Sequence, residues 1–249
     1  MDTTVYVALS AQVALQKQLE TVANNMANAN TAGFKADRPF FQSYLEPLSG
    51  PGGGVSFVQD AATYIDRTSG PMEVTGNPLD IALDGDGFLS VSGPGGTEYT
   101  RDGHLRVGPD STLTDAAGRA VLGADGSPIT MPPGFSDVQI KSNGNIKVSV
   151  NGRQQDVGQI GIVRPTNQTA VRKGGDGLLT APDGEMQPAT PDTGGALVVQ
   201  GSVEGSTVQP MKEIANMTEL SRAYERLQTM LSNESDRERK MIDALGHST

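Results

Sequence analysis

The residues best suited to chemistry are an alternating acidic run, Asp84-Gly85-Asp86-Gly87, and two histidines, His104 and His247. Alternating carboxylates are typical of helix-loop-helix calcium sites, which need an acid at the first position and a bidentate Glu at the twelfth. When the count starts two residues before the run, those positions are Ala82 and Gly93. We therefore predict a tight β-turn here and no metal site.

Nucleophilic catalysis has little support in the chain. There is no cysteine, which excludes disulfides and thiolate chemistry. A Ser-His-Asp site would have to use His104, because His247 lies among the last three residues, and neither a G-x-S-x-G elbow nor a phosphate-binding loop is present. We predict no catalytic residue, no cofactor and no enzymatic activity, with a hydrolase that uses His104 as the enzymatic alternative.

Composition narrows the classes of partner. The 19 basic and 29 acidic residues give a net charge of −10, which argues against nucleic acid, since a basic surface is its usual footprint. No apolar stretch approaches the ~20 residues of a membrane span, and the acidic start Met1-Asp2 lacks the basic segment of a secretory signal. A secreted β-domain that binds carbohydrate or a surface partner is a second alternative, although the absence of Trp leaves it without the usual aromatic platform.

The distribution of helix-breaking residues indicates which elements would hold any functional residues in place. All 15 prolines lie between Pro39 and Pro210, and all but one of the 31 glycines lie between Gly33 and Gly205. Gly costs a helix interior roughly 1 kcal/mol relative to Ala, and Pro roughly 3 kcal/mol. The two ends are therefore predicted to be helices around a β-rich middle.

Each predicted helix carries an apolar stripe with the 3- and 4-residue spacing of a helix face or a coiled-coil seam. Its members are Leu15, Leu19, Val22 and Met26 near the start of the chain, and Met217, Leu220, Tyr224, Leu227 and Leu231 near its end. Isolated helices are marginal in water, so we expect each helix to need a partner, either the other helix or a neighbouring subunit.

Asparagines crowd the predicted end of the first helix, at Asn24, Asn25, Asn28 and Asn30. Asn competes for backbone hydrogen bonds, and Gly33 followed by Phe34 suits a left-handed residue after a helix. We predict that the helix ends near Asn30. The asparagines indicate either a frayed helix end or amide groups that bond across a subunit contact.

The middle of the chain shows short runs of alternating apolar residues between turn signals, the pattern of a sandwich or barrel. The alternating residues are Leu79, Ile81 and Leu83; Leu89 and Val91; Leu105 and Val107; Val138 and Ile140; Ile146, Val148 and Val150; and Ile160 and Ile162. Turn dipeptides such as Asn143-Gly144 and Asn151-Gly152 separate them, and residues 47–54 (PLSGPGGG) are predicted to be a loose connector.

Five segments carry a family resemblance. Residues 23–35 (ANNMANANTAGFK) closely resemble a signature of the bacterial flagellar rod, hook and filament-junction proteins. Residues 77–88 (NPLDIALDGDGF), 99–103 (YTRDG), 200–208 (QGSVEGSTV) and 221–225 (SRAYE) resemble further signatures of that family. Met26 and Thr207 depart mildly from its pattern, where Leu and Asn are usual.

The resemblance implies an α+β fold whose N- and C-terminal helices pair as an antiparallel coiled coil, with a central mostly-β domain. The implied division is a first helix over 1–30, a connecting segment over 31–70, a β-rich domain over 71–207 and a last helix over 208–249. Gly33, Phe34, Asp102 and Gly103 are the implied turn residues of the motifs. The implied subunit-interface residues are the apolar stripes together with Asn24, Asn25 and Asn28.

The resemblance also implies a structural role. The opening Met1-Asp2 with Val5-Tyr6, and the gap of only about fifty residues between Phe34 and Gly85, are similar to the proximal rod members of the family. The implied protein is a proximal rod subunit that packs by its terminal helices into a torque-transmitting helical tube, with a distal rod subunit as the alternative. Implied partners are copies of itself, other rod subunits and the type III export apparatus, which would carry it to the periplasmic rod without a cleaved signal.

Overall fold

The structure is a computed structural model that describes residues 2–46, 55–66, 68–167, 171–174, 177–182, 184–189, 191 and 194–246. Within its helices and strands, the side chains at 2–6, 40–46, 55–63, 238, 241–242 and 244–246 are not described. The loose connector predicted at residues 47–54 lies outside the described residues.

The chain forms two compact units, each assembled from separated segments. The helical unit contains Met1–Ala27, Asp37–Ile65 and Val208–Thr249, and the β-rich unit contains Asn28–Ala36 and Asp66–Thr207. Within the predicted connecting segment, residues 37–65 group with the helices, whereas the residues on either side of them group with the β-rich unit.

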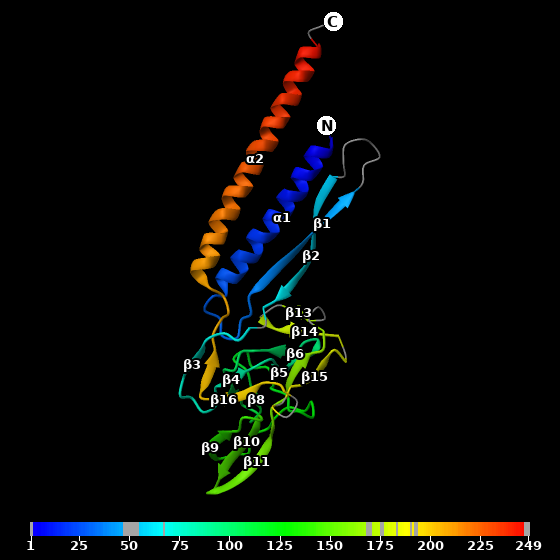
Figure 1. The fold of residues 1–249 in the computed structure, drawn as a ribbon. Coiled ribbons are helices and arrows are strands. Elements are labelled where there is room, and N and C mark those ends of the chain that lie inside the picture. The colour runs from blue at the N-terminus through cyan, green and yellow to red at the C-terminus, as the bar shows by residue number, and fades with distance from the viewer. Residues whose placement is uncertain are drawn as a thin grey trace. The chain divides into compact units, whose positions relative to one another are not determined.

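The helical unit consists of α1 (Asp2–Ala27), α2 (Pro210–Gly246) and a long antiparallel hairpin of β1 (Asp37–Glu46) and β2 (Val55–Ile65). In α2, Pro210 occupies the first helical turn, where its missing N–H costs nothing. Glu213 places an acidic group in that same turn, at the positive end of the helix dipole. In Figure 1 the blue α1 and the orange-to-red α2 lie side by side and run in opposite directions.

The first helix ends at Ala27, three residues before the predicted end near Asn30. The Thr31 N–H donates to the Asn28 carbonyl at 3.1 Å, and the Thr31 hydroxyl donates to Asn28 Oδ1 at 3.2 Å. The Phe34 N–H then donates to the Thr31 carbonyl at 3.2 Å. These successive turns replace the helical hydrogen bonds, because the short polar side chains compete for the backbone.

The β-rich unit is built from short antiparallel strands. One six-stranded sheet has the order β13-β14-β6-β5-β12-β15, and a second sheet has the order β11-β10-β9. The remaining strands form the pairs β16-β4, β17-β3 and β7-β8. The bounds are β3 (Met72–Val74), β4 (Ile81–Asp84), β5 (Phe88–Gly93), β6 (Gly96–Thr100), β7 (Arg106–Val107), β8 (Leu113–Thr114), β9 (Phe135–Ile140), β10 (Asn145–Val150), β11 (Arg153–Gln159), β12 (Ile162–Pro165), β13 (Arg172–Lys173), β14 (Leu179–Thr180), β15 (Met186–Pro188), β16 (Leu197–Gln200) and β17 (Ser202–Glu204).

The core of this unit is made mainly of aliphatic side chains, as the low aromatic content requires, and Phe88 is also fully buried. Its largest fully buried members include Ile81, Leu83, Leu89, Leu113, Met131, Ile146 and Ile160. Most of the alternating apolar residues found in the sequence lie in this core. The prediction of an α+β chain with terminal helices and a mostly-β middle is confirmed.

Candidate assembly surfaces and the junction of the sequence motifs

The motif turns meet inside the β-rich unit. The Gly33 N–H donates to the Glu204 carbonyl at 2.7 Å, and the Thr207 N–H donates to the Phe34 carbonyl at 3.0 Å. Gly33 has a φ of +68°, and a Cβ added there would lie 2.3 Å from the Arg101 carbonyl carbon. Only glycine fits this position, because both the backbone angle and the approach of Arg101 exclude a side chain.

A second close approach fixes the YTRDG turn. A Cβ on Gly103 would lie 1.6 Å from the Ile81 carbonyl oxygen, and the Ile81 N–H donates to the Gly103 carbonyl at 3.0 Å. Asp102 Oδ1 accepts the His104 N–H at 3.1 Å and lies 2.7 Å from His104 Nδ1. The Asp102 side chain therefore closes a local turn, and its contact with the His104 ring stabilises the same turn.

Three charged residues that sequence analysis did not single out join these motifs; we call Lys35, Arg101 and Glu204 the charge cluster. Lys35 Nζ lies 2.6 Å from Glu204 Oε1, and Arg101 Nη1 lies 2.8 Å from Glu204 Oε2. The exposed fractions of their side chains are only 3%, 1% and 0%. Each is a charged residue within one of the motifs (GFK, YTRDG and QGSVEGS), and this was the signal available in the sequence.

Backbone groups add further hydrogen bonds to the charge cluster, although the buried Nε of Arg101 has no hydrogen-bond partner among the described residues. Lys35 Nζ also donates to the Thr68 carbonyl at 2.6 Å, and the Gly70 N–H donates to Glu204 Oε1 at 2.7 Å. Arg101 Nη1 donates to the Leu83 carbonyl at 2.8 Å, and Nη2 donates to the Gly85 carbonyl. The run Asp84–Gly87, considered above as a calcium loop, thus gives a backbone oxygen to an arginine.

The electrostatics of the charge cluster follow from its composition of two cations and one anion. Burial, followed by the charge of Arg101, lowers the pKa of Lys35, and the contacts with Glu204 oppose this shift. Burial also lowers the pKa of Arg101, again opposed by Glu204. Since none of the three side chains reaches solvent to any useful extent, the cluster is suited to holding the fold and not to binding a substrate.

Phe34 is held in the same region by Lys173. Lys173 Nζ lies 3.6 Å from the centroid of the Phe34 ring and donates to the Lys35 carbonyl at 2.8 Å. The predicted motif-turn residues Gly33, Phe34, Asp102 and Gly103 therefore all lie where separated segments of the β-rich unit come together.

In the helical unit, the predicted apolar stripes are largely turned inward. Val22 is buried, Leu15, Leu19 and Met26 are half-buried, and in α2 the residues Leu220, Tyr224, Leu227 and Leu231 are half-buried as well. Met217 differs, with 41% of its surface exposed. Gln12 Nε2 donates to the Tyr224 hydroxyl at 2.9 Å, which joins α1 directly to α2.

The predicted interface asparagines take different positions. Asn25 is buried, and its side chain forms two hydrogen bonds with the backbone of Asp37 in the same chain. Asn25 Nδ2 donates to the Asp37 carbonyl at 3.0 Å, and Asn25 Oδ1 accepts the Asp37 N–H at 2.9 Å. Asn24 is exposed and Asn28 is half-buried in the turn after α1. A contact with another subunit remains a prediction for all three residues.

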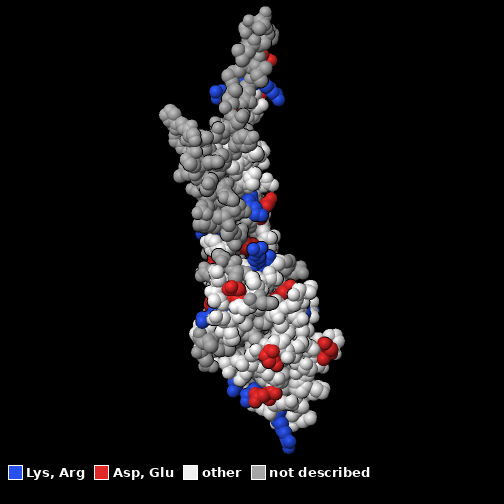
Figure 2. Space-filling view, turned by 90° about the vertical axis from the view of Figure 1, so that its right-hand side faces the viewer, with Lys and Arg blue, Asp and Glu red and all other residues white. Residues whose placement is uncertain are grey.

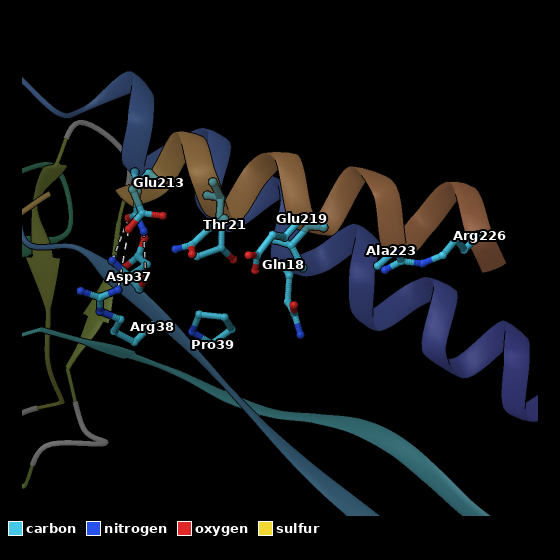
Figure 3. Close-up of a pocket in the computed structure, with 13 residues that line it drawn as sticks. Gln18, Thr21, Asp37, Arg38, Pro39, Glu213, Glu219, Ala223 and Arg226 are labelled. Carbon is cyan, nitrogen blue, oxygen red and sulfur yellow. Dashed lines mark hydrogen bonds and ion pairs between the residues drawn. The ribbon is translucent and has the colours of Figure 1, made fainter. Parts of the chain in front are cut away.

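A groove of about 540 Å³ runs along the helical unit between α1, α2 and the start of β1 (Figure 3). Its lining mixes apolar Val22, Leu220 and Pro39 with charged side chains. Near one end, Arg38 Nη1 lies 3.7 Å from Oε1 of the buried Glu213. Apolar and charged side chains thus share the walls of one groove.

Both helices also expose large apolar side chains. Leu9 and Val13, one turn apart on α1, are 50% and 60% exposed, and on α2 Met211 is 79% exposed. Ile214 and Met230 of α2 are about half exposed. Clustered exposed apolar side chains are typical of surfaces that another protein covers.

Other kinds of site find little support in the described part of the chain. On the face drawn in Figure 2, acidic and basic side chains lie scattered among uncharged ones. Among the described residues, no group of three or more His, Asp or Glu side chains is arranged to hold a metal ion. Within that same part, neither helix is long and apolar enough to cross a membrane.

Comparison with known proteins finds family models that match three separate segments of the chain. The family model described as "Flagella basal body rod protein" matches residues 5–35, which include most of α1. The model "Flagellar hook protein FlgE/F/G D1 domain" matches residues 82–148, and "Flagellar basal body rod FlgEFG protein C-terminal" matches residues 199–244. Together the three descriptions are of flagellar rod and hook proteins.

Similar proteins narrow the class to the flagellar basal-body rod proteins. The chain is 37% identical over 254 residues to the flagellar basal-body rod protein FlgF of Caulobacter vibrioides, with 99% of each chain covered. It is 31% identical to FlgF of Salmonella typhimurium, with 100% of each chain covered. It is 29% identical to the rod protein FlgG of Bacillus subtilis, with 88% of this chain covered. The chain belongs to the flagellar basal-body rod protein family, and within that family it is FlgF-like.

Proposed function

We propose that the chain is a structural subunit of the proximal rod of the flagellar basal body, and that it assembles through its terminal helices. The observation that carries this proposal is similarity along the whole chain to rod proteins named FlgF. A distal rod subunit is the alternative, since relatives named FlgG also match. The FlgG matches cover 85–88% of this chain, whereas the Caulobacter FlgF match covers 99%.

The geometry of the helical unit supports assembly by helix packing. Inward-facing apolar positions and the Gln12–Tyr224 hydrogen bond support an antiparallel coiled coil of α1 and α2. Exposed apolar residues on the outer faces, such as Val13 and Met211, leave surface for neighbouring subunits. The helices are then only marginally stable in the free chain and gain order when neighbours cover them.

The remaining parts of the proposal concern partners and place. The neighbours are copies of the chain and other rod subunits, joined head to tail in an open helix and not in a closed ring. The chain reaches the periplasmic rod through the type III export apparatus without a cleaved signal. The predicted stripes, together with Asn24, Asn25 and Asn28, are the proposed contact residues, and the protein transmits torque without enzymatic activity.

Substitution of Leu227 tests the role of the helix seam. Leu227→Asp puts a charge into the half-buried face of α2, so the variant should be exported and yet be strongly depleted from purified basal bodies. Gln228→Asp makes the same charge change at the exposed neighbouring position and should be incorporated normally. Normal incorporation of Leu227→Asp would show that the seam is not an assembly element.

The position along the rod needs a different experiment. Electron cryotomography of motors in cells that lack only this chain should show an inner ring with a rod that stops early. A rod that stops near its outer end would favour the distal alternative. Complete rods and hooks would overturn the proposed function and favour a secreted binding protein.

A further inference from the structure

The charge cluster lies close to the points where the chain passes between its two units. Three of these passages follow Ala36, Ile65 and Thr207. Lys35 immediately precedes Ala36, and Glu204 lies three residues before the passage after Thr207. Thr68 and Gly70, which bond to the cluster, follow the passage after Ile65.

The backbones of two of these segments are also bonded to each other. The Gly33 N–H donates to the Glu204 carbonyl, the Thr207 N–H donates to the Phe34 carbonyl, and the Ala36 N–H donates to Thr207 Oγ1 at 2.8 Å. The segments 33–36 and 204–207 therefore run together within the β-rich unit, with Lys35 and Glu204 facing one another.

We propose that Glu204 is the shared counter-ion of a buried clamp that fastens the connecting segments 33–36, 68–70 and 204–207 to the body of the β-rich unit through Arg101. The attachment to the body is direct, because Arg101 also bonds to the carbonyls of Leu83 and Gly85 at the end of β4. One carboxylate thus meets a lysine, an arginine and a backbone N–H that come from three different parts of the chain.

Charge balance predicts that the three residues of the charge cluster differ in how much stability is lost when each charge is removed. Removal of the Glu204 charge leaves two buried cations without an anion, and an uncompensated buried charge is far more costly than a missing pair. Removal of the Lys35 charge leaves a balanced pair of Arg101 and Glu204. Loss of Lys35 should therefore be milder than loss of Glu204, and should partly rescue it.

Urea unfolding of the purified full chain tests this order. Glu204→Gln should lower the folding equilibrium constant by on the order of 100- to 1,000-fold. Lys35→Met should lower this constant much less. In the double variant the folding equilibrium constant should be at least about 10-fold higher than in Glu204→Gln alone, because the second substitution removes an unpaired cation. If Glu204→Gln does not fold, the prediction is that adding Lys35→Met restores folding.

The matched control is Glu73→Gln, the same substitution at an exposed position of β3, opposite Val203 in the β17–β3 pair. It should change the equilibrium constant by no more than roughly 2-fold. The clamp is overturned if Glu204→Gln costs no more than this control. It is also overturned if Lys35→Met adds its own cost to that of Glu204→Gln and gives no rescue.

Amide hydrogen exchange shows whether the effect is local. In the double variant, exchange of the Gly33, Gly70 and Thr207 amides should accelerate over the parent chain at least about 10-fold more than exchange of the Val148 amide in β10. The reason is that only the connecting segments are released. Equal acceleration at all four amides would mean that the cluster supports the whole unit and is not a clamp on these segments. The experiment uses the free chain, so failure of rod assembly would not affect it.

Discussion

Asn25 and Asp37 are joined by two reciprocal hydrogen bonds. Asn25 Nδ2 donates to the Asp37 carbonyl at 3.0 Å, and the Asp37 N–H donates to Asn25 Oδ1 at 2.9 Å. The buried amide side chain thus pairs with the first residue of β1 as a neighbouring strand would. An asparagine near the end of α1 fixes where the hairpin begins, within the helical unit.

Asn25→Asp should loosen that start of the hairpin. A carboxylate accepts the Asp37 N–H but cannot donate to its carbonyl, and an unmet buried hydrogen bond costs about 1–3 kcal/mol. The amide of Asp37 should therefore exchange at least about 10-fold faster than in the parent chain. Asn24→Asp, the same change at the exposed preceding position, should leave that amide unaffected. Equal protection of Asp37 in both variants would contradict the prediction.

The proximity of Gln12 and Tyr224 can be tested by crosslinking, because the chain has no cysteine of its own. In purified basal bodies, Gln12→Cys with Tyr224→Cys should react within one chain with a short bismaleimide, since the two side chains are hydrogen-bonded at 2.9 Å. Gln12→Cys with Arg222→Cys places the second thiol at an exposed position of α2 and should crosslink several-fold more slowly. Mobility shifts on denaturing gels provide the measurement. Similar rates for the two pairs would mean that the helices do not pack in this register.

Gly103→Ala should destabilise the β-rich unit by at least about 2 kcal/mol, because the added carbon would overlap the Ile81 carbonyl oxygen and force the backbone apart. Gly95→Ala is the control, since a Cβ there would meet only Glu98 Oε1, at 3.8 Å. Urea unfolding of both variants measures the difference. A Gly103→Ala chain as stable as Gly95→Ala would refute the close contact.

The pKa of Lys35 makes a prediction about alkaline pH. Because the pKa of Lys35 is lowered in the folded state, the folded chain loses this proton before the unfolded chain does. Between the lowered pKa and 10.5 the unfolded chain binds more protons, so the contribution of Lys35 to the free energy of unfolding rises with pH. Groups near Lys35 are Arg101, which lowers its pKa, and Glu204 and Asp66, which raise it.

Comparison of the parent chain with Lys35→Met isolates that contribution, since other titrating groups cancel in the difference. The parent chain should gain stability relative to Lys35→Met as the pH rises through this window. Urea unfolding at a series of pH values up to about 10.5 measures it. A difference that stays constant or falls with pH would show that the pKa of Lys35 is not lowered.

The sequence by itself determined the broad architecture. Helix breakers confined to the middle and apolar spacing at both ends predicted α1 and α2, because helix formation depends on local propensity and a 3.6-residue period. Alternation at positions such as Ile81 and Leu83 predicted strands for the same local reason. The motif at residues 23–35 indicated the family, since thirteen consecutive positions carry far more information than a short pattern.

Only the tertiary structure decided what the charged motif residues do. Lys35, Arg101 and Glu204 are separated by 66 and 103 positions in the chain, and no local period relates them. Their burial as one cluster depends on how three distant segments meet. The pairing of Asn25 with Asp37 likewise depends on how the end of α1 and the start of β1 pack together. Long-range pairing is set by the packing of the whole β-rich unit. The role of these charged motif residues in holding its connecting segments therefore follows from no local pattern in the sequence.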